Sequence, residues 1–177
     1  MSNNNLFRIG GIAIILGILL MIAGFAVPAL LGVGALFFAV FYYALYRYFG
    51  DQSPSLNLLA AILGVGGSIF YAVIAFLNIT TGLLFNLATL VAFFLAPLVF
   101  GLLAYPTASL PRMLAIFATV AGVFGFLNFV IVTIGGGDYT NPNNPALNPM
   151  ILGTYYVGML AGVIWMVWSA IILFRKA

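Results

Sequence analysis

Few side chains in this sequence can do acid–base, nucleophilic or metal chemistry. The 177 residues include no histidine and no cysteine, and the only acidic side chains are Asp51 and Asp138. Zinc and haem sites need histidine or cysteine ligands, and serine hydrolases need a base. An aspartyl mechanism needs two adjacent carboxylates, whereas these two are expected on opposite faces of a membrane. We therefore expect no enzyme activity, no metal site and no cofactor.

The composition indicates a membrane protein. Apolar residues make up 66% of the chain and charged residues only 4%, and the mean hydropathy is +1.28. An ordinary soluble domain carries roughly 25% charged residues, so this chain has too little polar surface to face water. The lipid bilayer is the expected partner, and nucleic acid is not.

The first long apolar run must fold back on itself. Residues 9–46 carry no charge, and as one helix they would run about 57 Å, nearly twice a ~30 Å hydrocarbon core. Pro28 stands near the middle of this run and lacks the backbone donor that a continuous helix needs. Polar loops rich in glycine and proline divide the rest of the chain. The prediction is an all-α integral membrane bundle, a single domain over 1–177, with six transmembrane helices at about 9–27, 29–46, 58–77, 82–105, 114–134 and 150–174.

The basic residues predict the orientation of these spans. Lysine and arginine accumulate in cytoplasmic loops. With six spans, every basic residue falls on the side of the N-terminus, so both termini are expected to be cytoplasmic, at the inner (plasma) membrane of the cell. These residues are Arg8, Arg47, Arg112, Arg175 and Lys176.

Small residues recur at helical spacing in four of the spans. Lipid tails are as apolar as leucine, so transmembrane helices associate where small residues let their backbones approach. We expect spans one, three, five and six to make the close contacts, and the bulkier spans two and four to turn phenylalanine-rich faces to lipid or to a partner. The predicted packing residues are Gly10, Gly17, Gly24, Gly64, Ser68, Gly122, Gly125, Gly158 and Gly162.

A few polar residues lie within the predicted spans. Several are expected at one depth near the outer ends of their helices, where they could form an outward-facing pocket for a neutral ligand such as a quinone or a lipid headgroup. The favoured interpretation is simpler, namely that the asparagines bond across helices or to their own backbone. The candidate ligand-binding residues are Tyr71, Asn86, Thr89, Asn128 and Thr154.

Parts of the sequence resemble known families in their helix pattern. Residues 110–114 (LPRML) and 121–125 (AGVFG), with a closing helix over 165–175, resemble the last two spans of small bacterial multi-pass membrane proteins of unknown function. The first hairpin, with its glycine-rich helix and central Pro28, is similar to the small six-helix acid-resistance membrane family. What these resemblances imply is a bacterial inner membrane and no particular activity.

Two functions from different classes remain. The first is a non-catalytic accessory or assembly subunit that packs against a larger membrane complex or forms a homo-oligomer, which the short loops and the missing chemistry favour. The alternative is a binding protein or carrier for a neutral or lipidic small molecule, which would use the polar pocket. Replacing Asn86 and Asn128 by leucine separates the two, because only the carrier would lose a ligand while keeping its fold.

Overall fold

Six helices in the computed structural model are long and apolar enough to cross a membrane, which confirms the predicted number of spans. The structure describes residues 3–50, 52–107, 110–135 and 145–177. Asp51, Asp138 and most of the loop predicted after the fifth span lie outside these ranges. Within them, all regular structure is helical.

Five of the six spans are longer than the apolar runs that predicted them, and the fourth is one residue shorter. The first begins at Asn3 rather than near residue 9, because a helix can continue through polar residues beyond the hydrocarbon. The elements are α1 (Asn3–Gly24), α2 (Ala29–Tyr48), α3 (Pro54–Ala61), η1 (Ile62–Gly66), α4 (Gly67–Phe76), α5 (Gly82–Leu90), η2 (Val91–Leu95), α6 (Ala96–Ala104), α7 (Arg112–Gly135), η3 (Pro145–Leu147) and α8 (Asn148–Lys176).

Prolines mark the beginnings of several helices. Pro28 immediately precedes α2, Pro54 is the first residue of α3, and Pro149 lies in the first turn of α8. A proline is tolerated there because the first backbone N–H groups of a helix have no partner inside it. Pro28 therefore separates the first two spans, as the sequence predicts.

The third and fourth spans each contain one π-helical turn. The third span runs through α3, η1 and α4, and the fourth through α5, η2 and α6. In the fourth span, Pro97 follows η2 and has no N–H to donate to the carbonyl four residues earlier, which accounts for the loosened turn. In the third span, η1 contains Gly64 and Gly66, and glycine holds the helical conformation weakly.

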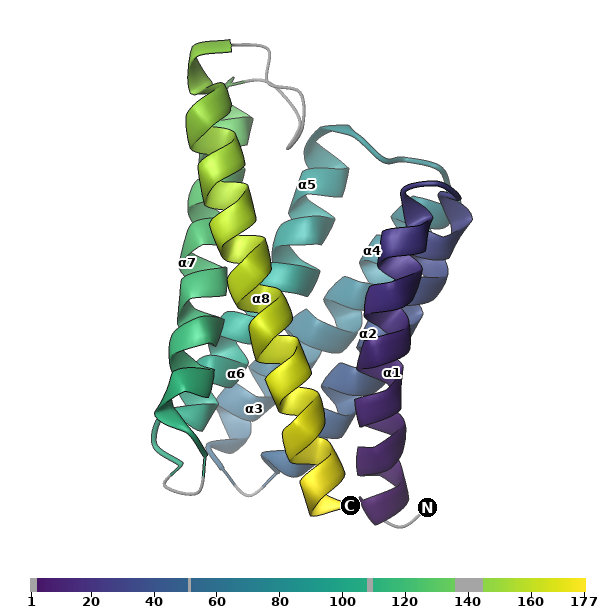
Figure 1. The fold of residues 1–177 in the computed structure, drawn as a ribbon, viewed down its shortest axis with the longest axis vertical. Helices are drawn as coiled ribbons and strands as arrows, with labels where there is room; N and C mark the ends of the chain where they lie inside the picture. The colour runs from purple at the N-terminus through teal and green to yellow at the C-terminus, as the bar shows by residue number, and fades with distance from the viewer. Residues whose placement is uncertain (1–2, 51, 108–109, 136–144) are drawn as a thin grey trace.

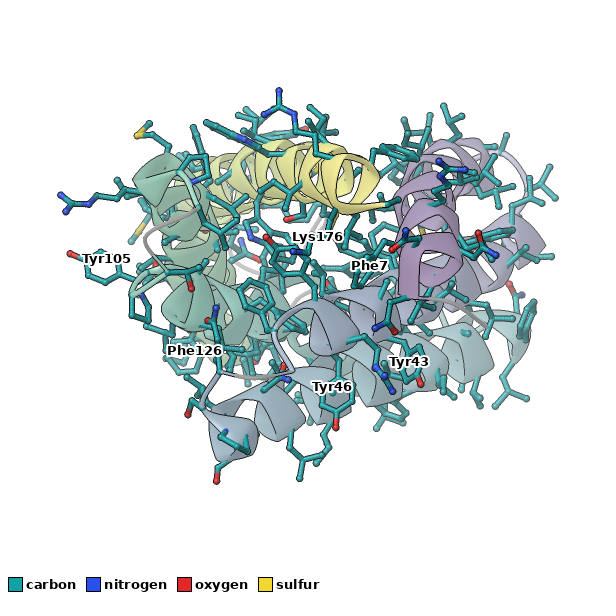
Figure 2. The ribbon with its side chains drawn as sticks, turned by 90° about the horizontal axis from the view of Figure 1, so that it is seen from below. Phe7, Tyr43, Tyr46, Tyr105, Phe126 and Lys176 are labelled. Atoms are coloured by element: carbon teal, nitrogen blue, oxygen red, sulfur yellow. The ribbon has the colours of Figure 1, made fainter. Side chains whose placement is uncertain are left out.

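The six spans form a closed ring in which each packs on the next along the chain. The last helix, α8, returns to pack against α1, and the two π-helical turns of the third and fourth spans contact each other. Figure 1 shows both chain ends at the same end of the bundle, where α1 begins and α8 finishes. Figure 2 shows the ring from that end.

The expectation that the second and fourth spans turn their aromatic faces outward is wrong. In the fourth span, 67% of the apolar stretch is buried, against at most 44% in any other span. In α2, the side chains of Phe38, Phe41 and Tyr42 are buried in the core. The large residues face inward because the small residues of the other four spans leave space for them.

Each predicted packing glycine lies against a neighbouring helix. A methyl group added to Gly64 would overlap the ring of Tyr42, and one added to Gly17 would meet Phe38 at 2.9 Å. Ser68 is fully buried in the same span as Gly64. The other contacts join Gly10 to Ala44, Gly24 to Leu31, Gly122 to Leu98, Gly125 to Phe94, Gly158 to Phe94 and Gly162 to Ala121.

Candidate functional site

The centre of the bundle is filled by three stacked aromatic rings from three helices. Tyr42 of α2 lies nearly parallel to Phe100 of α6, with ring centroids 5.8 Å apart and planes 8° apart. Trp165 of α8 stacks on both, with centroids 6.4 Å from each. All three side chains are at most 1% exposed. Such contacts contribute about 0.5–1.5 kcal/mol per pair beyond the burial of area, so this cluster fastens the second, fourth and sixth spans together.

The hydroxyl group of Tyr42 reaches the fourth span at its π-helical turn. It donates a buried hydrogen bond of 2.7 Å to the backbone carbonyl oxygen of Ala92, inside η2. The backbone of Ala92 also lies close to the third span, since a Cβ on Gly67 would come within 3.1 Å of it. Tyr42 therefore ties the second span to the place where the third and fourth meet.

Tyr42 does not stand out in the sequence as a functional residue. Tyrosines usually lie at the edges of a transmembrane span, where the hydroxyl reaches water. Tyr42 lies five residues before Arg47, close to the end of an apolar run, so its place in the sequence is that of an ordinary edge tyrosine. Its burial, and the carbonyl that accepts its bond, follow only from the packing of the helices.

Two of the five candidate ligand-binding residues share one hydrogen-bond cluster. The side-chain amide nitrogen of Asn128, on α7, donates to the carbonyl oxygen of Ile151 at 2.7 Å and to the hydroxyl oxygen of Thr154 at 2.9 Å, both on α8. The Thr154 hydroxyl donates in turn to the carbonyl of Met150 at 2.7 Å. Asn128 is fully buried, so the cluster joins the fifth and sixth spans inside the protein.

The other three candidates lie on the third and fourth spans. The ring of Tyr71, on α4, packs against Phe85 and Phe93 with centroids 5.4 Å and 5.0 Å away. The hydroxyl of Thr89 donates to the carbonyl of Phe85 at 2.8 Å, one turn back along α5. Asn86 is buried on the same helix. Tyr71 thus packs between the third and fourth spans, Thr89 bonds within its own helix, and none of the five candidates lines either of two hollows in the structure.

A small hollow opens on the aromatic cluster toward the end of the bundle that carries the termini. Its volume is about 10 Å³, room for about one water molecule. A second, shallow groove of about 320 Å³ lies on the outer face of α8. The hollow is lined by Leu45, Tyr48, Phe49, Phe100, Leu110, Leu114, Trp165, Ser169 and Ile172.

Side chains also fasten the connecting segments at that end. Asn57 is 1% exposed and donates from its amide nitrogen to the carbonyl oxygen of Tyr46 at 3.0 Å. Thr107 donates to the side-chain oxygen of Gln52 at 2.8 Å. Asn57 thereby holds α3 to the end of α2, and the Thr107 bond links the segment after α6 to the segment after α2.

No protein-family model, no curated protein and no solved structure matches this chain.

Proposed function

We propose that this protein is a non-catalytic accessory or assembly subunit that packs against a larger membrane complex. The observation that carries the proposal is the filled interior, in which Tyr42, Phe100 and Trp165 stack across the centre of the bundle. Polar donor groups bond to the protein itself in several places, as the amide nitrogen of Asn128 does between α7 and α8. A rigid helical body with short connections is suited to binding another membrane protein through its outer surface.

The proposal places both termini in the cytoplasm and the protein in a bacterial inner membrane. The chain begins and finishes at one end of the bundle (Figure 1). The helices carry all five basic residues toward that same end, which agrees with the enrichment of lysine and arginine on the cytoplasmic side.

The docking surface that we propose is the outer face of α2. Leu36, Val40 and Tyr43 follow one another at helical spacing on this face and are 38–45% exposed. The ring of Tyr43 lies beside that of Tyr46, with centroids 6.3 Å apart, and Figure 2 shows both rings on the same side of α2. Exposed tyrosines combine a large apolar ring with a hydroxyl group, which makes them common at protein interfaces.

Site-specific photocrosslinking in the native membrane tests this proposal. A photoreactive amino acid at Tyr43 should give a discrete protein adduct of reproducible mass. The matched control is Phe126 on α7, which is 50% exposed and should react only with lipid. An adduct from Phe126 alone would overturn the choice of face. If no exposed position on any of the six spans gives a protein adduct, the accessory role is refuted.

One observation favours the carrier as a second candidate. The side-chain oxygen of Asn128 is buried and has no hydrogen-bond partner within the described part of the chain. A neutral ligand with a donor group would satisfy it if α7 and α8 part to admit the ligand, because Asn128 lines neither hollow. The test is the native mass of the purified wild-type protein and of Asn128→Leu, with mass spectrometry of what co-elutes. A small molecule that leaves only the variant supports the carrier, whereas protein partners that stay with both support the accessory subunit.

A further inference from the structure

The outer face of α8 carries a shallow groove with an apolar floor. Its volume is about 320 Å³, and every residue that lines it belongs to this one helix. Four of the lining side chains are 37–44% exposed, and the indole of Trp168 is partly buried against Phe117 of α7, with centroids 6.5 Å apart. The lining residues are Val163, Ile164, Val167, Trp168 and Ile171.

A basic residue continues the groove on the same side of the helix. Ile164, Trp168, Ile171 and Arg175 are spaced by four, three and four residues, and side chains at this spacing lie along one face. Arg175 is exposed and lies in the last turn of α8. The groove therefore leads from apolar side chains in the middle of the helix to a positive charge at its end.

The length of this stripe matches one leaflet of a bilayer. Arg175 lies twelve positions after Val163, which is about 18 Å along the helix axis at ~1.5 Å per residue. Half of a ~30 Å hydrocarbon core is about 15 Å. When the groove lies among the acyl chains, Arg175 reaches the level of the phosphate groups.

Arg175 has no acidic side chain on its own helix or on the flanking helices to pair with, so its fitting partner is an anion from outside the protein. Neither α8 nor the helices that flank it, α1 and α7, contains an acidic side chain. The neighbouring basic residue, Lys176, lies elsewhere, since Figure 2 shows it over the end of the bundle beside Phe7 rather than on the outer face of α8. The positive charge at the end of the groove is thus that of Arg175.

We propose that the outer face of α8 binds an anionic phospholipid, with one acyl chain in the groove and the headgroup phosphate on Arg175. The occupant is a lipid rather than a free phosphate because the apolar groove and the charge form one continuous stripe. This proposal does not depend on the accessory role, because it concerns a helix face other than the proposed docking face on α2.

The two tryptophans of the chain make the proposal directly measurable. Trp168 lines the groove, whereas Trp165 is 1% exposed in the core. Bromine on an acyl chain quenches tryptophan fluorescence on contact. The Trp165→Phe protein, which reports on Trp168 alone, is reconstituted into phosphatidylcholine vesicles. These contain an equal fraction of either dibrominated phosphatidylglycerol or dibrominated phosphatidylcholine.

We expect the brominated anionic lipid to occupy the groove with about fivefold preference, the ratio that ~1 kcal/mol per basic residue near a membrane surface corresponds to. Arg175→Gln should abolish this preference. Lys176→Gln, which removes the same charge one residue further along, should keep it. Trp168→Phe, which reports on Trp165 alone, should be quenched weakly by both lipids.

Equal quenching of Trp168 by the two lipids would overturn the proposal, since it would show ordinary contact with bulk lipid. An equal loss of preference in Arg175→Gln and Lys176→Gln would overturn it as well, because the attraction would then be diffuse. If Trp165→Phe does not fold, the difference between the wild-type protein and Trp168→Phe reports the same signal. Loss of every protein crosslink would refute the accessory role and leave this result untouched.

Discussion

Hydroxyl groups on the helices of this protein differ in whether they find an acceptor. Thr89, Thr119 and Thr154 each donate to the carbonyl oxygen four residues earlier. Ser68 is fully buried, and its hydroxyl has no hydrogen-bond partner among the described residues. The carbonyl four residues before Ser68 belongs to Gly64, inside η1, where the helix departs from the α-helical hydrogen-bond pattern. The π-helical turn thus accounts for the missing bond.

Ser68→Ala is therefore expected to stabilise the protein by about 1 kcal/mol, because it removes a buried polar group without a partner. The measurement is the free energy of unfolding in mixed micelles as the fraction of denaturing detergent rises. The control is Thr89→Val, which loses a bonded hydroxyl and should be destabilised. A Ser68→Ala protein less stable than the wild type would contradict the assignment.

Tyr42 combines a hydrogen bond with a ring contact, and two substitutions separate them. Tyr42→Phe keeps the ring and should lower the free energy of unfolding by about 0.5–1.5 kcal/mol, the range for one hydrogen bond. Tyr42→Ala also removes the stack on Phe100 and Trp165 and should cost about 3–5 kcal/mol, as other large core truncations do. The same detergent titration measures both. Equal costs for the two variants would show that the ring adds nothing.

Helix packing here depends on rings that fit against glycines. Phe94 of η2 lies against Gly125 of α7 and Gly158 of α8, so one aromatic side chain joins three spans. Small residues permit close backbone approach in a bilayer, and in this bundle they also provide the recesses for aromatic side chains. The fourth span is the most buried because its large residues fill those recesses.

Gly125→Ala is expected to destabilise the bundle by about 1–3 kcal/mol, since the added methyl group overlaps Phe94 and the packed core has to shift. Gly153→Ala is the matched control on α8, because no atom lies within 4 Å of a Cβ at that position. The control should be neutral or up to about 1 kcal/mol more stable. Thermal unfolding in detergent compares the two, and similar losses would contradict the packing.

The bond from Tyr42 is expected to depend on the π-helical turn before Pro97. Pro97→Ala restores an N–H group and favours a continuous α-helix, which turns the carbonyl of Ala92 away from Tyr42. The cost of Tyr42→Phe should then shrink toward zero in the Pro97→Ala background. A double-mutant cycle measures this coupling. An unchanged cost of Tyr42→Phe in that background would show that the two features are independent.

For the whole molecule, the absence of native cysteines makes the topology simple to test. Gln52 and Thr81 lie just before and just after the third span, which runs from Pro54 to Phe76. Single cysteines at these two positions are expected to react with a membrane-impermeant maleimide from opposite faces. Reaction of both from the same face would contradict a third span that crosses the membrane.

The sequence by itself determined the number of spans and the positions of their breaks. Both follow from local properties, namely the length of an apolar run compared with a bilayer and the missing donor of Pro28. It also identified glycines that pack against neighbouring helices, because small residues at helical spacing form one stripe on a helix.

Only the tertiary structure decided what those glycines pack against and which polar groups meet. The sequence predicts outward-facing aromatic residues in the second and fourth spans, because in a uniformly apolar chain hydrophobicity does not distinguish a lipid-facing side from a buried one. Asn86, Asn128 and Thr154 share a predicted depth, which says nothing about rotation around each helix axis. The Tyr42 bond to Ala92 joins residues fifty positions apart, and such a pairing exists only once the helices are packed.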